Sequence, residues 1–104
     1  MQADQLELNA ENVIAELDKL ANPSHAATLR WFFKAGPGEY GEGDEFLGIK
    51  VPIIRQAAKP FRMLSNAEIE KLIQSRVHEH RFAALAILNY QFEKARDPGR
   101  QEEI

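Results

Sequence analysis

Three glycines in the middle of the chain match the spacing of a phosphate-binding loop. Gly36, Gly38 and Gly41 spell G-x-G-x-x-G, the pattern in which backbone N–H groups at a helix N-terminus hold a pyrophosphate. That site follows a β-strand, whereas the residues before these glycines, RWFFKA, have helical spacing. Carboxylates also crowd the same loop: Glu39, Glu42, Asp44 and Glu45. Because carboxylates repel a phosphate at short range, we predict that the glycines end one helix and turn the chain.

The acidic residues and histidines do not have the spacing of a metal site. A calcium-binding EF-hand needs acidic ligands at alternate positions and a bidentate glutamate at the end of the loop, and Glu39, Glu42 and Asp44 do not keep that spacing. His78 and His80 are two residues apart, so on one helix their side chains diverge. The sequence therefore predicts a solvated acidic loop, no metal site and no cofactor.

Basic residues in the second half have the spacing of a phosphate-contacting surface. Arg55 and Lys59 are four residues apart and project from one face of a predicted helix, with Arg62 soon after. Arg76 and Arg81 flank a predicted turn between helices. Arginines at helix ends are natural phosphate contacts, and a solvated face is the alternative for each of them.

Consecutive aromatic residues precede the glycine loop. Trp31, Phe32 and Phe33 would cover about 200° of a helix surface, so they cannot all face one core. We expect two of the rings to pack in the core and the third to remain available as a platform on which a base could stack.

Length and composition indicate one small helical domain. The chain has 104 residues and no cysteine, which excludes disulfides and thiolate metal sites. It contains no apolar run long enough for a transmembrane helix and no signal-peptide pattern at the N-terminus, so we expect a cytoplasmic protein without membrane contacts. Residues 1–52 carry a net charge of −5 and residues 53–104 a net charge of +2. A nucleic-acid surface would therefore lie in the second half.

Hydrophobic periodicity and capping residues predict five helices. Asn9, Asn22 and Ser65 are expected N-caps, and Ser65 with Glu68 forms a capping-box pattern in which Glu68 reaches back to Ser65. The predicted helices span residues 10–21, 23–35, 52–59, 67–75 and 78–95. Residues 97–99 (Asp-Pro-Gly) should end the fifth helix, and residues 100–104 look like the start of another.

Apolar residues at helical spacing predict which faces are buried. In the first helix these are Val13, Ile14, Leu17, Leu20 and Ala21, and in the fifth they are Phe82, Leu85, Ala86, Leu88 and Phe92. Short turns between the helices favour antiparallel pairs stacked in an array, an all-α architecture of the α-solenoid type.

Two segments resemble a known family. The stretch FLGIKVPIIR, residues 46–55, resembles the F-L-G-[IV]-x-x-P-x-x-R signature of the DNA alkylation repair (AlkD-like) family. The stretch EHRFAALAIL, residues 79–88, is similar to the next marker of that family, and the resemblance extends over residues 17–95. It implies an α-solenoid of HEAT-like helix pairs whose concave face holds duplex DNA. Active members are glycosylases that excise N3- or N7-alkylated purines without moving the base into a pocket.

The resemblance assigns DNA-contact roles to residues of this chain but matches none of them to a catalytic residue of the family. The family places its catalytic aspartate in a Trp-Asp segment, whereas Asp97 lies in an Asp-Pro-Gly sequence without a neighbouring tryptophan. Arg55 matches the arginine of the signature, and Trp31 or Phe32 falls near the lesion-side aromatic of the family. We therefore expect residues 1–104 to be a single helical-repeat domain, the N-terminal part of a longer glycosylase homologue, inactive by itself.

The expected partner is duplex DNA, with or without alkylated bases, contacted by the basic residues named above: Arg55, Lys59, Arg62, Arg76 and Arg81. An apolar face left on the fifth helix would favour a homo-oligomer. The alternative function is a non-catalytic HEAT-like module that binds protein or branched DNA.

Overall fold

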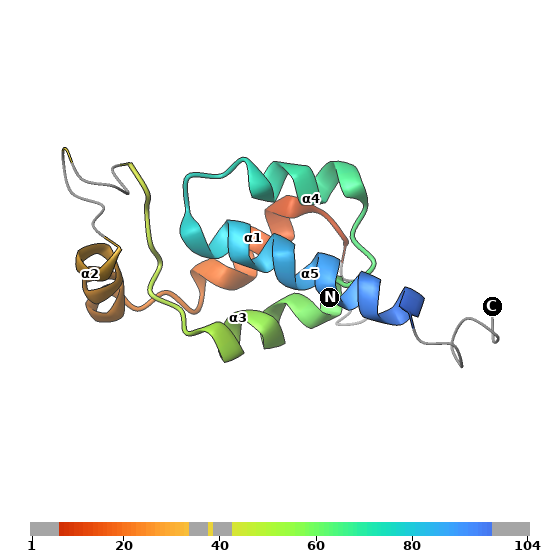
Figure 1. The fold of residues 1–104 in the computed structure, drawn as a ribbon, viewed down its shortest axis with the longest axis horizontal. Helices are drawn as coiled ribbons and strands as arrows, with labels where there is room; N and C mark the ends of the chain where they lie inside the picture. Colours follow the sequence, from red (N-terminus) through yellow and green to blue (C-terminus); the bar gives the residue numbers. More distant parts are fainter. Residues whose placement is uncertain (1–6, 34–37, 39–42, 97–104) are drawn as a thin grey trace.

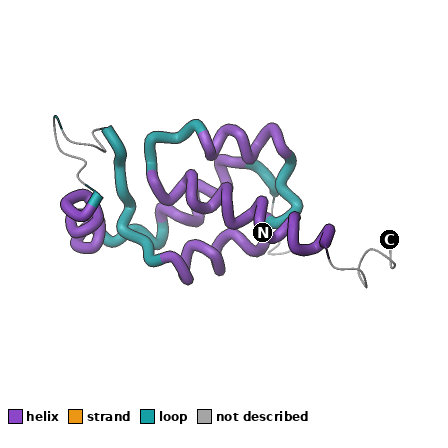
Figure 2. The backbone as a smooth tube through the Cα atoms, viewed as in Figure 1, coloured by secondary structure: helices purple, strands orange, loops and turns teal. Residues whose placement is uncertain are grey.

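The structure, a computed structural model, describes residues 7–33, 38 and 43–96, and its described part is helical (Figure 1). The helices are α1 (Ala10–Asp18), α2 (Pro23–Phe32), α3 (Val51–Ala58), α4 (Asn66–Ile73) and α5 (His78–Arg96), with a short 3₁₀ helix, η1 (Lys59–Phe61), after α3. Figure 2 shows helices and loops in the described part and no strand. The predicted all-α fold with five helices is confirmed.

Three helices begin at the capping residues that the sequence indicated. The side chain of Asn9 accepts a hydrogen bond from the Asn12 N–H at 2.7 Å, and that of Asn22 accepts one from the His25 N–H at 3.2 Å. Ser65 Oγ accepts from the Glu68 N–H at 3.3 Å. Each bond satisfies a backbone donor that the first turn of a helix leaves without an intrahelical partner.

The second half of the predicted capping box is wrong. The Glu68 carboxylate does not return to Ser65; its Oε1 accepts a hydrogen bond from the Ala10 N–H of α1 at 2.8 Å. Its Oε2 forms an ion pair with Lys71 Nζ at 2.9 Å. The Ala10 N–H and the Lys71 ammonium together hold the pKa of Glu68 below its usual value. The carboxylate therefore links two helices, because the unpaired donors at the start of α1 lie close to it.

Some helix boundaries differ from the prediction. α1 ends at Asp18, so Leu20 is 41% exposed and Ala21 is also exposed. After α3 the chain continues into η1, which contains Pro60, because a proline fits the first turn of a short helix. The predicted cap at Gly36, the break at residues 97–99 and the helix start at residues 100–104 lie outside the described residues.

α5 is the central helix of the core, which we call the four-helix core and which consists of α1, α3, α4 and α5. It packs against each of the other three helices, and in Figure 1 it lies beside α3 with the same direction. Its fully or almost fully buried apolar residues are Ala83, Ala84, Ala86 and Ile87. Leu85 and Phe92, which we predicted to be buried, are 59% and 58% exposed. Small side chains face the neighbours because α5 is approached from several sides at short distance.

α2 stands apart from the four-helix core. Figure 1 shows it beyond the ends of the core helices, and it has no extensive packing with any other described helix. Ala26 is the buried residue of α2, and it lies against the extended residues 46–50. α1 and α2 follow each other closely in the sequence but do not pack extensively on each other. No helix among the described residues is long and apolar enough to cross a membrane.

Candidate functional site

The basic strip, which we define as Arg55, Lys59 and Arg62, follows α3 and η1. All three residues are exposed. Arg55 lies in the last turn of α3, Lys59 opens η1, and Arg62 follows it directly. The structure therefore brings together on one continuous segment the three bases that the sequence analysis grouped.

Side chains of α5 fix the backbone beneath the basic strip. The Tyr90 hydroxyl donates a hydrogen bond to the Arg55 carbonyl at 3.1 Å. Gln91 Nε2 donates to the carbonyls of Arg62 and Leu64, each at 2.9 Å. The Arg55 carbonyl also accepts a hydrogen bond from the Lys59 N–H at the end of α3, whereas Arg62 and Leu64 lie in the turn between η1 and α4. The side chains of α5 therefore fix both ends of the strip.

The basic strip has no counter-ion within the described part of the chain. The ion pairs found there are Lys19–Glu16, Lys71–Glu68 and Arg81–Asp44, and none involves the strip. Three exposed cations close together in the sequence, without an internal acid, attract a polyanion whose charges are regularly spaced, such as the phosphates of a nucleic-acid backbone.

Arg62 Nη1 donates to the Lys59 carbonyl at 3.2 Å, a bond within the basic strip. Arg76 and Arg81 lie elsewhere and bond to the glycine-rich loop and the α4–α5 turn. Arg81 Nη1 donates to the Ser75 carbonyl at 2.7 Å, and its Nη2 pairs with Asp44 at 3.2 Å. Arg76 Nη2 donates to the Gly43 carbonyl at 3.2 Å. Both side chains therefore hold the end of the glycine-rich loop against the α4–α5 turn. Arg81 is nine residues before Tyr90 on α5, or roughly 13 Å along the helix axis, so the structure does not join this pair to the basic strip.

The aromatic end of α2, which we define as Trp31, Phe32 and Phe33, is exposed. These residues are 81%, 67% and 44% exposed, so the expectation that two of the rings lie in the core is wrong. Phe33 stacks on Phe46 with ring centroids 5.7 Å apart, and Phe32 meets the edge of Phe33 at 5.3 Å. Phe33 also contacts the His78 ring at the start of α5, with centroids 5.3 Å apart. Trp31 and Phe32 remain exposed because no helix packs extensively on α2.

Residues 46–50 form the hook that holds α2. The Asn22 N–H donates to the Leu47 carbonyl at 2.7 Å, and Gly48 has a φ of 86°. A Cβ on Gly48 would lie 2.1 Å from the Asn22 carbonyl oxygen and 2.6 Å from the Ala26 nitrogen. Only glycine allows both this backbone conformation and this close approach of α2.

A buried carboxylate holds the hook from the other side. Glu79 in the first turn of α5 is fully buried. Its Oε1 accepts a hydrogen bond from the Leu47 N–H at 2.8 Å, and its Oε2 accepts from the N–H groups of Gly48 at 2.9 Å and Ile49 at 3.3 Å. Three converging N–H donors stabilise a charge that would otherwise be costly to bury.

His80 is the second buried polar residue of α5. Its Nδ1 lies 2.8 Å from Ser75 Oγ, which also accepts a hydrogen bond from the Val77 N–H at 3.0 Å. Its Nε2 is buried and has no partner among the described residues. Burial lowers the pKa of His80 below its usual value of 6.5, although the carboxylates of Asp18, Glu79 and Glu45 oppose that effect.

We expect the free energy of unfolding to fall as the pH is lowered through the range below 6.5, the usual pKa of histidine. The unfolded chain binds a proton at His80 in this range while the folded chain resists it, so the stabilisation is complete above this value and is lost on acidification. Urea unfolding of the wild type and of His80→Gln at about pH 7.5 and about pH 5.5 measures this contribution. The variant should lose less stability between the two conditions, and an equal loss in both proteins would contradict the assignment.

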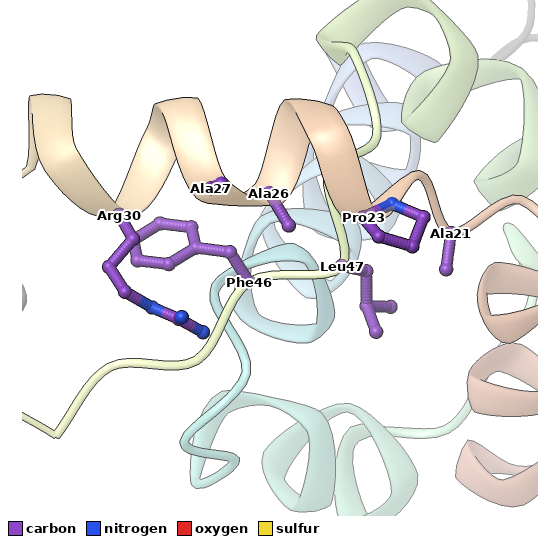
Figure 3. Close-up of a pocket in the computed structure, with 7 residues that line it drawn as sticks. All are labelled: Ala21, Pro23, Ala26, Ala27, Arg30, Phe46 and Leu47. Atoms are coloured by element: carbon purple, nitrogen blue, oxygen red, sulfur yellow. The ribbon is translucent and has the colours of Figure 1, made fainter.

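A shallow depression lies between α2 and the hook (Figure 3). It has a volume of about 320 Å³ and is lined by Ala21, Pro23, Ala26, Ala27, Arg30, Phe46 and Leu47. Arg30 is the single ionisable residue of this lining, so the depression has no acid–base pair with which to catalyse a reaction. Among the described residues, no group of histidine, cysteine or carboxylate side chains is arranged to hold a metal ion.

The sequence analysis did not predict that Glu79 is a buried acceptor of backbone hydrogen bonds, nor why position 48 requires a glycine. A signal for Glu79 was present, because Glu79, Ala83, Ala86 and Tyr90 recur at helical spacing and a carboxylate within an apolar stripe requires donors. The donors themselves come from residues more than 29 positions earlier, which no local pattern reveals.

Comparisons with known proteins agree with the resemblance noted in the sequence. Neither the curated proteins nor the solved structures contain a significant match to the chain. A model of the family described as "DNA alkylation repair enzyme" matches residues 13–102 and so includes the hook, the basic strip and Glu79. This match covers most of the chain, and the protein belongs to the DNA alkylation repair enzyme family.

Proposed function

We propose that this chain binds duplex DNA as part of a DNA alkylation repair protein, with the basic strip on the phosphate backbone. The observation that carries the proposal is the set of three neighbouring exposed cations without an internal counter-ion in the described part of the chain. Membership in the repair family supports DNA as the ligand. Cationic side chains held by a fixed backbone can follow the regular spacing of phosphates.

The aromatic end of α2 completes the proposed interface. Trp31 and Phe32 extend their rings into solvent, where they can stack on an exposed base or pack beside an alkylated one. Arg76 is exposed in the turn before α5 and adds a further cation to the proposed interface, whereas the charge of Arg81 is already paired with Asp44. In this proposal no described residue acts as the catalytic acid, and excision of N3- or N7-alkylated purines requires groups from outside this chain.

We expect Arg55→Gln combined with Lys59→Gln to weaken duplex binding about tenfold in about 0.1 M salt and to reduce the salt slope by about two. Fluorescence anisotropy of a labelled short duplex, titrated at several salt concentrations, gives both quantities. The matched control is Lys19→Gln combined with Lys71→Gln, which removes the same charge from residues that form ion pairs with Glu16 and Glu68.

The control should bind within about twofold of the wild type, because it alters net charge without altering the strip. Equal losses in the two double variants would mean that net charge alone matters, and the strip would then have no specific role. A wild type that fails to bind duplex would favour the alternative, a non-catalytic module that binds protein or branched DNA. Self-association through the exposed face of α5 stays a prediction from the sequence.

A further inference from the structure

The placement of α2 relative to the four-helix core depends on the hook and on one direct ring contact, between Phe33 and His78 of α5, with centroids 5.3 Å apart. α2 has no extensive packing with another described helix, and its buried residue, Ala26, lies on Gly48 of the hook. The Asn22–Leu47 hydrogen bond joins the same two segments at the start of α2. The hook therefore holds the start and the buried face of α2, while the ring contact with His78 touches Phe33 and leaves Trp31 and Phe32 exposed.

The Glu79 carboxylate is the polar attachment of the hook to α5, beside the apolar contacts of Ile49 in the core and of Phe46 with His78. Three consecutive N–H groups, those of Leu47, Gly48 and Ile49, donate to it at 2.8–3.3 Å. Glu79 forms no ion pair within the described residues, so these N–H groups are the main compensation for its buried charge. Hydrogen bonds to a buried carboxylate are short, directional and stronger than those between neutral groups, which suits them to hold a backbone segment in one orientation.

The four-helix core has its own packing. Leu17 of α1, Ile54 of α3, Leu72 of α4 and Ile87 of α5 are fully or almost fully buried together. This apolar contact does not pass through the Glu79 carboxylate. Loss of one acceptor oxygen should therefore loosen the backbone of Leu47 and Gly48, and with it α2, while Ile49 and the core helices remain packed.

We propose that Glu79 is a positioning residue that fixes α2, with its exposed Trp31 and Phe32, against the four-helix core. The carboxylate orders the hook, and the hook orders α2. The consequence for DNA, namely that the aromatic end is presented in a constant position relative to the basic strip, rests on the proposed function.

Because the sequence contains no cysteine, spin labels can be attached specifically to pairs of introduced cysteines, and the distance between the labels can be measured. One spin-labelled pair, Thr28→Cys with Gln56→Cys, joins exposed positions of α2 and α3. A second pair, Gln56→Cys with Glu70→Cys, joins exposed positions of α3 and α4 within the core. Electron paramagnetic resonance then gives the distance distribution of each pair in the otherwise native chain and in Glu79→Gln.

Glu79→Gln keeps the size of the side chain but places an amide N–H₂ opposite at least one N–H donor of the hook. We expect the α2–α3 distribution to broaden about twofold or more, while the α3–α4 distribution stays unchanged. Glu93→Gln, an exposed carboxylate on the same helix, is the matched control and should alter neither distribution. Gly48→Ala acts on the opposite side of the hook and should also broaden the α2–α3 distribution.

An α2–α3 distribution that stays narrow in Glu79→Gln would overturn the proposal. So would equal broadening of both pairs, because Glu79 would then support the whole fold and not the position of α2. Failure of the wild type to bind duplex would contradict the proposed function and leave the distance result intact, so the two failures can be distinguished.

Discussion

Replacing Gly48 with alanine is expected to lower the free energy of unfolding by about 3 kcal/mol or more. Two effects add. A φ of 86° is unfavourable for any residue with a Cβ, and the new methyl group would lie 2.1 Å from a backbone oxygen and 2.6 Å from a backbone nitrogen of the α2 region. Backbone atoms cannot rotate away as a side chain can, so the hook or α2 must move. Urea unfolding followed by circular dichroism measures the loss.

The glycines of this chain provide their own control. Gly38 has a φ of 75°, similar to that of Gly48, but a Cβ there would meet no atom within 4 Å. Gly38→Ala should therefore cost only the conformational part, about 1 kcal/mol. If Gly48→Ala and Gly38→Ala had equal effects, the close contact between the hook and α2 would be absent in solution.

Phe61→Ala is expected to cost about 3–5 kcal/mol in the free energy of unfolding. Phe61 ends η1 and is 1% exposed, and η1 packs on both α3 and α5. Removal of the ring leaves a cavity beneath the turn that carries Lys59 and Arg62. A loss of this size is a large part of the stability of a domain of this length, so Tm should fall markedly in a calorimetric scan.

Phe32→Ala is the matched comparison for Phe61→Ala. Phe32 is 67% exposed, so its removal should change the free energy of unfolding by less than about 0.5 kcal/mol. A similar cost in the two variants would mean that the aromatic end of α2 is covered in solution. The contrast separates an aromatic residue that builds the fold from one that is available to a ligand.

The same contrast explains how the proposed interface is built. The basic strip lies on the four-helix core and is fixed by Tyr90 and Gln91 of the central helix. The aromatic end lies on a helix that is attached mainly through the hook, with one further ring contact between Phe33 and His78 of α5 at 5.3 Å. A substitution in the hook should therefore affect the aromatic end without displacing the strip.

Local signals predicted much of the helical pattern. Asn9, Asn22 and Ser65 start helices as expected, because an N-cap satisfies backbone donors within three residues of itself. The FLGIKVPIIR motif indicated the correct family, and the match over residues 13–102 confirms it. These features depend on neighbours in the sequence, so the sequence alone was sufficient to identify them.

Predictions failed where the relevant partner is distant in the sequence. Glu68 bonds to Ala10, 58 residues away, and not to its own cap. Leu85 was assigned to the core by its helical spacing, but three alanines and Ile87 form the buried side of α5, because three helices approach it closely.

The sequence by itself determined the helical class, the helix starts, the repair family and the grouping of Arg55, Lys59 and Arg62, since each follows from residue types at short spacing. Only the tertiary structure decided that α2 stands apart, that its aromatic end is exposed, and that Glu79 and Gly48 hold the segment between α2 and the core. The physical reason is that the role of a buried carboxylate depends on which N–H groups donate to it, and the need for a glycine depends on which backbone atoms lie where a Cβ would be. Those groups are brought together by packing, which no local pattern specifies.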